Sequence, residues 1–313
     1  MTTMTLDLEA PSLPERLRNY LTIMYPPLPR LGAAGLMTLG FRAALGLAHG
    51  ESSGEPALQM LLGAVAVFLF LLILRLMDEL KDTDVDLRLF PERPLPSGMV
   101  RESDLRGALA VTTLLFLAVN IPMPGAFPFA VALLCYALLM FVWFFHPDVL
   151  KPNLLLTLAT HNPVVGLMFL YLAAVTADEQ GVAADALHPG VVAATVLQYW
   201  AMGFSWEISR KIRMAQEENA YVTYSQILGR RGALTVALGA QTVAVAVAIG
   251  MWLLRGSSPV WPALVAAAYG GSVAATVRHL RSNPPPSAGL KAQSELFMFA
   301  VASAAVLEWL FTR

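Results

Sequence analysis

Composition places this chain among integral membrane proteins. Of its 313 residues, 57% are hydrophobic and 14% are charged, and the mean hydropathy is +0.60. A soluble domain carries about a quarter charged residues, so a water-soluble enzyme is excluded. The formal net charge of -1 gives no bulk attraction to nucleic acid. The single cysteine, Cys135, excludes an intrachain disulfide and a cysteine-based metal site.

Apolar stretches of about 20 residues, the length that crosses a bilayer as a helix, recur along the whole chain. We predict an all-α integral membrane protein with a cytoplasmic N-terminal segment, residues 1–28, and a single nine-helix membrane domain, residues 29–313. The nine predicted spans are 29–48, 56–79, 103–121, 124–145, 153–176, 187–208, 232–254, 259–279 and 293–311.

The loops between these spans differ in their content of Lys and Arg. With the N-terminus inside, seventeen basic residues lie on the cytoplasmic side, against two, Arg255 and Arg313, on the other. Because cytoplasmic loops are enriched in Lys and Arg, we predict a multi-pass protein of the cell (inner) membrane, with a cytoplasmic N-terminus and the C-terminus on the opposite side. The two long charged loops, 80–102 and 209–231, then face the cytoplasm.

An acidic cluster follows the second predicted span. Asp78, Asp82 and Asp86 are four residues apart, so on a continuing helix they share one face. Three carboxylates at a membrane boundary repel one another unless a positive group neutralises them. Mg²⁺ prefers oxygen ligands and is often shared between carboxylates and substrate phosphates. The sequence indicates a metal-bridged phosphate or diphosphate site at this rim. The alternative is a solvated loop of mixed charge, with Lys81 and Arg88 among the acids.

The second charged loop begins with another constellation. Glu207, Arg210 and Lys211 are spaced i, i+3 and i+4, so they share one helical face and can pair with each other. One interpretation is a local cluster of ion pairs at the membrane interface. The other is a second wall of a phosphate site, in which Arg210 and Lys211 bind diphosphate oxygens. In that case Glu207, Glu217 or Glu218 contributes to metal coordination.

These motifs resemble those of the UbiA-type intramembrane prenyltransferases. The family signature Asn-x-x-x-Asp-x-x-x-Asp, followed by Arg-Pro-Leu/Ile-x-Ser-Gly, is similar to Asp78-Glu-Leu-Lys-Asp82-Thr-Asp-Val-Asp86 and Arg93-Pro-Leu-Pro-Ser-Gly98. The chain departs from the family where Asp78 replaces Asn. It departs again where Glu207-x-x-Arg210-Lys211 replaces an Asp-x-x-x-Asp signature. The resemblance implies a UbiA-like bundle with a central cavity that opens to the cytoplasmic side.

The resemblance also implies an activity. It is the transfer of a prenyl group from a polyprenyl diphosphate to a lipophilic acceptor, aromatic or a quinone precursor, by Mg²⁺-assisted ionisation. The implied metal ligands are Asp78, Asp82, Asp86, Glu207 and Glu218. The implied diphosphate ligands are Arg93, Lys151, Arg210 and Lys211, with Lys151 alternatively a basic anchor at the cytoplasmic interface.

Polar residues also occur inside the fifth predicted span, where Thr160, His161 and Asn162 precede Pro163. Buried polar groups in a membrane need partners, so His161 and Asn162 either satisfy the backbone at the proline kink or act on the substrate. In the second case they orient the acceptor or take its proton. Two other functions stay open: a membrane terpene cyclase on the same scaffold, and a non-catalytic lipid-binding or transport protein. We predict no site for nucleic acid.

Overall fold

The computed structural model describes residues 11–49, 58–255, 259–281 and 285–311, and its regular structure there is helical. Residues 56–57 of the predicted second span and the basic residue Arg313 lie outside this part. The helices are α1 (Leu13–Met24), α2 (Pro27–His49), α3 (Leu58–Lys81), α4 (Thr83–Leu89), α5 (Glu102–Asn120), α6 (Phe127–Phe141), α7 (Pro147–Leu150), α8 (Leu154–His161), α9 (Pro163–Gln180), α10 (Pro189–Ser209), α11 (Tyr224–Arg255), α12 (Val260–His279) and α13 (Ala288–Phe311). Short 3₁₀ turns are η1 (Trp143–Phe145), η2 (Ala184–Ala186) and η3 (Ala215–Glu217).

Each predicted span coincides with a helix or, for the fifth span, with the pair α8 and α9, which the break at Asn162 separates. Within the described part of the chain, six helical segments are long and apolar enough to cross a membrane: Pro27–His49, Leu58–Lys81, Leu154–Gln180, Tyr224–Leu254, Val260–His279 and Ala288–Phe311. The other three predicted spans fall on α5, α6 and α10, of which α6 has only 15 residues. The all-α architecture is therefore confirmed, while nine crossings stay a prediction.

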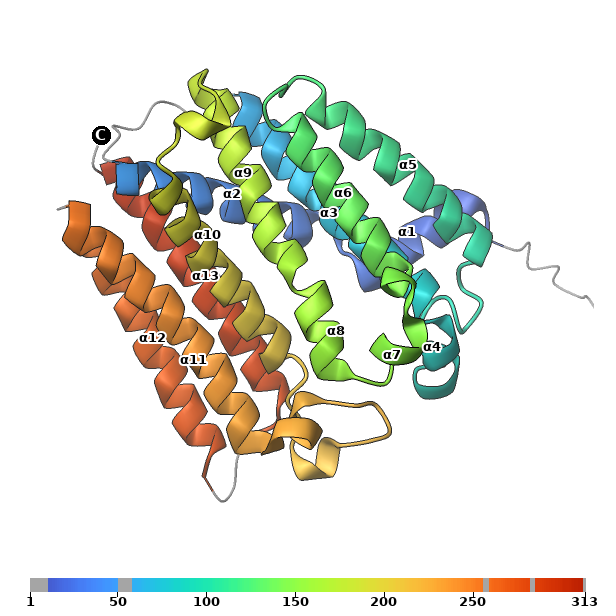
Figure 1. Ribbon diagram of the computed structural model, residues 1–313. Helices are drawn as coiled ribbons and strands as arrows, with labels where there is room; N and C mark the ends of the chain where they lie inside the picture. Colours follow the sequence, from blue (N-terminus) through green and yellow to red (C-terminus); the bar gives the residue numbers. More distant parts are fainter. Residues whose placement is uncertain (1–10, 50–57, 256–258, 282–284, 312–313) are drawn as a thin grey trace, which may run out of the picture.

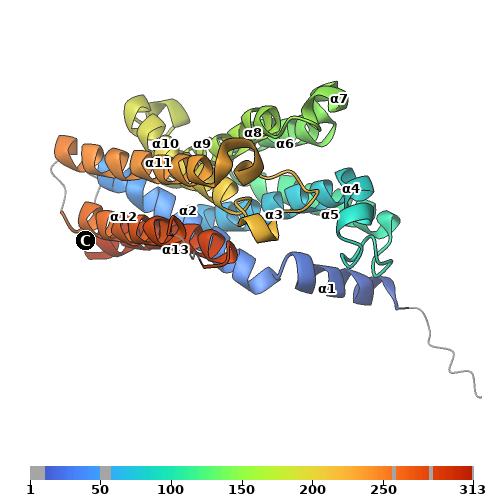
Figure 2. The ribbon, with the colours of Figure 1, turned by 90° about the horizontal axis from the view of Figure 1, so that it is seen from below.

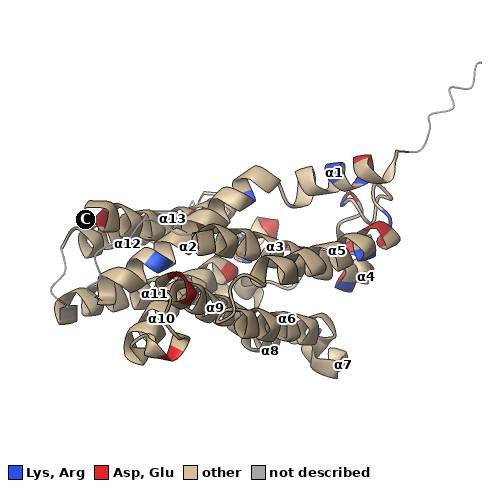
Figure 3. Ribbon diagram, turned by 90° about the horizontal axis from the view of Figure 1, so that it is seen from above, with Lys and Arg blue, Asp and Glu red and all other residues tan. Residues whose placement is uncertain are grey.

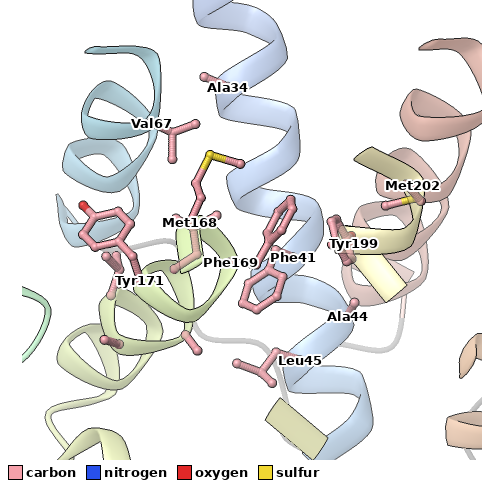
Figure 4. Packing of buried hydrophobic residues seen from close by; sticks show 14 of the residues in the cluster. Ala34, Phe41, Ala44, Leu45, Val67, Met168, Phe169, Tyr171, Tyr199 and Met202 are labelled. Atoms are coloured by element: carbon pink, nitrogen blue, oxygen red, sulfur yellow. The ribbon is translucent and has the colours of Figure 1, made fainter. Parts of the chain in front are cut away.

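The long helices form one bundle in which α2, α9 and α10 meet at the centre (Figure 1). Phe41 of α2, Phe169 of α9 and Tyr199 of α10 are fully buried, with ring centroids 5.1–5.4 Å apart (Figure 4). On the other side of α2, a Cβ added to Gly40 would lie 2.7 Å from the Cβ of Ala302 in α13. Since lipid gives helices no hydrophobic drive to associate, such close contacts position the helices.

Loops that are far apart in the sequence meet at one end of the bundle. The rings of Phe90, after α4, and Tyr221, before α11, lie 5.8 Å apart. The Ser287 N–H, before α13, donates to Glu217 Oε1 at 3.2 Å. The loops 80–102, 209–231 and 280–292, all predicted to be cytoplasmic, are thus joined by direct contacts. Figure 1 places α4, α7 and the connection between α10 and α11 at this end.

The opposite end gathers the loops that were predicted to lie outside. The Gly125 N–H, in the turn before α6, donates to Asp178 Oδ1 at 3.0 Å. The His188 N–H, before α10, donates to the ring of His49 at 3.1 Å. The described loops therefore alternate between the two ends as the charge distribution predicts. Which side of the membrane each end faces stays a prediction.

The first helix was not predicted, because its segment is polar and contains proline. It lies on the flank of the bundle beside α5 (Figure 2). Arg16 of α1 forms a two-pronged ion pair with Asp104 of α5, at 2.7 and 2.9 Å. The helical part of the predicted cytoplasmic N-terminal segment is thus tied to the bundle, at the end where the charged loops meet.

A groove of about 470 Å³ lies between α12 and α13. Its lining is mostly apolar and includes Leu264, Ala268, Phe297, Ala300 and Leu307. None of the predicted site residues lines it, so it is separate from the charged loops. A central cavity that opens to the cytoplasmic side stays a prediction.

Candidate functional site

The acidic motif lies where α3 ends and α4 begins. Asp82 stands between the two helices, with φ −101° and ψ 13°. The backbone N–H of Asp82 nevertheless donates to the Asp78 carbonyl at 3.0 Å, and that of Asp86 to the Asp82 carbonyl at 2.9 Å. Helical spacing thus continues across the junction, although the helix itself is interrupted. Charged residues are frequent in α4 and the adjoining ends of α1 and α5, whereas α12 and α13 are largely uncharged (Figure 3).

The three acids of this motif differ in their partners. Asp86 is buried and accepts a hydrogen bond of 2.6 Å from Arg93 Nη1. Asp78 is exposed, and its Oδ1 lies 3.4 Å from Lys81 Nζ. Among the residues that the structure describes, no side chain donates a hydrogen bond to Asp82 or pairs with it within 4 Å. Asp82 is therefore the acid whose carboxylate is left for another group.

The surroundings of Asp82 oppose its negative charge. Burial, and then the charges of Asp78 and Asp86, raise the pKa of Asp82 to about 6, while Lys81 and Lys211 act in the opposite direction. In the described part of the chain, no three acidic, His or Cys side chains converge to hold a metal ion. A cation here would therefore be held by fewer than three protein side chains. Asp82 and Asp78 are the two acids best able to bind it.

In the second charged loop, the acids are already bonded to neighbouring groups. Glu207 accepts from Arg210 Nε at 2.6 Å and lies 3.2 Å from Lys211 Nζ. Glu218 accepts from Thr223 at 2.9 Å and from Ser225 at 2.6 Å. These bonds fix the loop before α11. They also make Glu207 and Glu218 weaker candidates for metal ligands than Asp82.

Glu217 also accepts hydrogen bonds that fix the loop before α11. It accepts from the backbone N–H of Met214 at 2.9 Å and from that of Ser287 at 3.2 Å. Burial would raise the pKa of Glu217, but hydrogen bonding to Ser287 and Met214 and the charge of Arg213 together lower it. Glu217 therefore connects the loop before α11 to the one before α13.

The structure brings the two charged loops together, as the diphosphate interpretation requires. Besides the Phe90–Tyr221 contact, Lys211 is close enough to Asp82 to act on its ionisation. Arg210 is in turn within electrostatic range of Asp78. The cations of one loop thus face the acids of the other.

A third segment, between α6 and α7, completes this end of the bundle. The sequence predicts helix up to residue 145, but α6 ends at Phe141. Trp143, Phe144 and Phe145 follow with φ of 54°, 50° and 63°, in the left-handed region. For residues other than glycine this conformation costs roughly 1–3 kcal/mol each. Tertiary contacts must therefore hold the turn, and they include Lys81 and Lys151, whose ammonium groups lie 4.5 and 5.7 Å from the centre of the Trp143 ring.

His161 and Asn162 lie at the break between α8 and α9. The Thr160 carbonyl at this break accepts a hydrogen bond of 2.7 Å from the Tyr136 hydroxyl. Two buried atoms, His161 Nε2 and Asn162 Oδ1, have no partner among the described residues. The His161 ring centroid lies 5.4 Å from that of Trp143. Both residues therefore offer buried polar atoms, and His161 lies beside the Trp143 ring, which Lys81 also contacts.

Sequence reasoning did not assign roles to Lys81 and Trp143. The signal for Lys81 was visible, since it stands inside the acidic motif beside Asp82. No sequence signal marks Trp143, because its position depends on a left-handed turn that tertiary contacts stabilise.

No family model and no curated protein matches the chain. Two solved structures do. One, of a digeranylgeranylglyceryl phosphate synthase in membranes, has 17% identity, a TM-score of 0.63, and covers 95% of this chain and 99% of its own. The other, the apo structure of a UbiA homolog from Aeropyrum pernix K1, has 18% identity, a TM-score of 0.59, and covers 88% and 97%. The chain has the UbiA-type fold. The resemblance predicted from the motif is thus confirmed for the fold, and with its six apolar segments the chain is a multi-pass membrane protein.

Proposed function

We propose that this protein transfers a prenyl group from a polyprenyl diphosphate to a lipophilic acceptor. The observation that carries the proposal is Asp82, a half-buried acid with no protein partner among the described residues, at the point where cationic side chains of three segments meet. Lys81 and Lys211 act on Asp82 directly, and Lys151 shares the Trp143 ring with Lys81. Acids that can bind a metal, next to cations that can bind phosphate oxygens, suit a magnesium diphosphate.

The residues divide into two groups. Asp78 and Asp82 would hold Mg²⁺, which neutralises charge on the departing diphosphate. Arg93, Lys151, Arg210 and Lys211 would bind the diphosphate oxygens and stabilise the charge that develops when the bond to the allylic carbon breaks. Asp86 already pairs with Arg93 and orients it. Glu207 orients Arg210 and Lys211 in the same way.

The remaining steps are the cleavage of the allylic C–O bond and the capture of the cation by the acceptor. When the allylic C–O bond breaks, its electron pair leaves with the diphosphate oxygen and an allylic cation remains. The acceptor then forms a bond to that carbon and loses a proton. His161 Nε2 and Asn162 Oδ1, buried and without a described partner, would orient the acceptor or accept its proton. Apolar spans around the site would exclude water, which would otherwise capture the cation.

The test measures inorganic diphosphate released from farnesyl or geranylgeranyl diphosphate by purified protein with Mg²⁺ and mixed lipophilic acceptors. Release should require the metal and should stop with EDTA. Asp82→Ala should abolish it, whereas Asp84→Ala, an exposed acid two residues away, should retain it. Equal turnover by the Asp82→Ala variant and the wild type would refute the proposal. Release without any acceptor-derived product would indicate the cyclase alternative.

A further inference from the structure

Two lysines from different segments, Lys81 at the end of α3 and Lys151 after α7, lie near the Trp143 ring. The Lys81 ammonium is 4.5 Å from the centre of the ring, and the Lys151 ammonium is 5.7 Å away. A cation within about 6 Å of an indole ring is attracted by the ring's electrons, and the attraction grows when water is excluded. One aromatic ring thus holds two positive charges near each other, although they repel.

Neither lysine is fully neutralised by a carboxylate. The Lys81 side chain is only 8% exposed, and its nearest carboxylate oxygen, Oδ1 of the exposed Asp78, is 3.4 Å away. Among the described residues, no acid lies within 4 Å of the Lys151 ammonium. A buried ammonium with one long ion pair keeps donors unsatisfied. Both lysines therefore have binding capacity left for an anion.

The turn that presents Trp143 is strained. Trp143, Phe144 and Phe145 all have positive φ, a conformation that side chains other than glycine seldom adopt. Strain of this kind persists only where neighbouring groups enforce it, and it is concentrated at functional sites. The neighbours of Trp143 are the two lysines and the His161 ring, all at the charged end of the bundle.

We propose that Trp143 is a positioning residue, which holds Lys81 and Lys151 so that both ammonium groups bind the diphosphate of the substrate. Lys81 is then a diphosphate ligand beyond those that the motifs suggest. This inference rests on the proposed function for its substrate. The competing explanation is that Lys81 only neutralises Asp78 and the negative end of α3, which would require no indole ring.

The experiment measures the affinity for inorganic diphosphate with Mg²⁺, and the KM for farnesyl diphosphate, in lipid nanodiscs. Lys81→Met should weaken both by about tenfold or more, since a charge-assisted hydrogen bond contributes that much. Trp143→Leu should give a similar loss, while Trp143→Phe, which keeps an aromatic face, should recover most of it. Lys291→Met is the matched control, because Lys291 is half-exposed and 3.8 Å from Glu295.

A variant series separates positioning from a merely structural role. In the Lys81→Met/Lys151→Met background, Trp143→Leu should have no further effect on diphosphate affinity, because the groups it positions are gone. An undiminished loss there, or an unchanged affinity in Trp143→Leu alone, would overturn the inference. If the wild type binds inorganic diphosphate through Lys81 yet releases none from any prenyl diphosphate, the proposed function fails while the role of Trp143 stands.

Discussion

The two charged loops both carry acids, but the acids differ in their partners. In the first loop, Asp82 is half-buried and unpaired among the described residues, and its pKa is raised. In the second, Glu207 is bonded to Arg210 and Lys211, and Glu218 to hydroxyl groups. The first loop therefore leaves one carboxylate without a protein partner among the described residues, while the second presents paired acids and cations of its own.

The largest expected effect comes from the same change made in each loop. Asp82→Asn removes a charge that has no protein partner and should lower diphosphate release by roughly a hundredfold or more, the scale of one lost interaction with transition-state charge. Glu218→Gln removes a charge that only holds the loop and should change release by less than about threefold. Assays of diphosphate release by both variants test this contrast. Similar losses of release in the two variants would contradict it.

The next effect concerns the cations of the second loop. Lys211→Met should raise the KM for the prenyl diphosphate by about tenfold to a hundredfold, since it removes a charge-assisted contact. Arg231→Met, a basic residue of α11 without an ion pair to any described acid, is the control and should leave KM unchanged. An equal rise in KM for both variants would mean that Lys211 acts only through the overall positive charge of the loop and not through a specific contact.

The raised pKa of Asp82 predicts a pH dependence. A metal must displace the proton from this carboxyl, so affinity for Mn²⁺ should rise about tenfold from pH 5 to pH 7 and level off above a pKa of about 6. Without metal, the folded protein binds this proton more tightly than the unfolded chain. Stability should therefore fall as pH rises from 3.8 to about 6. Measurements of Mn²⁺ affinity and of stability against pH, for the wild type and for Asp82→Asn, check both trends. The variant should show neither pH dependence.

The smallest effect separates loop stability from chemistry. Glu218→Gln weakens acceptance of hydrogen bonds from Thr223 and Ser225, so it should lower the free energy of unfolding by about 1 kcal/mol. Thermal unfolding in nanodiscs would report this. Glu102→Gln, which breaks an exposed ion pair with Arg106, should change stability by less than about 0.5 kcal/mol. A larger change in the control would mean that the assay reports surface charge.

The helix positions and the spacing of the acidic motif could be predicted from the sequence, because local residue patterns determine both. Apolar runs located a helix in every predicted span, because lipid requires the backbone to bond within itself. The spacing of Asp78, Asp82 and Asp86 anticipated that their backbones would stay one turn apart across the α3–α4 junction. The UbiA-type fold followed from the same motif.

The sequence does not reveal which side chains these residues contact in the folded protein. Glu218 bonds to side chains five and seven residues farther on, across a loop whose path no local pattern sets. The left-handed turn at Trp143 depends on lysines and a histidine from other segments. Such contacts form only after the helices pack, which explains why the motif identified the acids but not the one left unpaired.

The central claim is that the first loop binds one metal ion while the second supplies protein cations. Its most direct test counts Mn²⁺ bound per chain in the presence of inorganic diphosphate, by electron paramagnetic resonance of the free ion. We expect one ion per chain, lost in Asp82→Ala and retained in Glu218→Gln. Two ions per chain, or an ion lost in Glu218→Gln and retained in Asp82→Ala, would contradict the account.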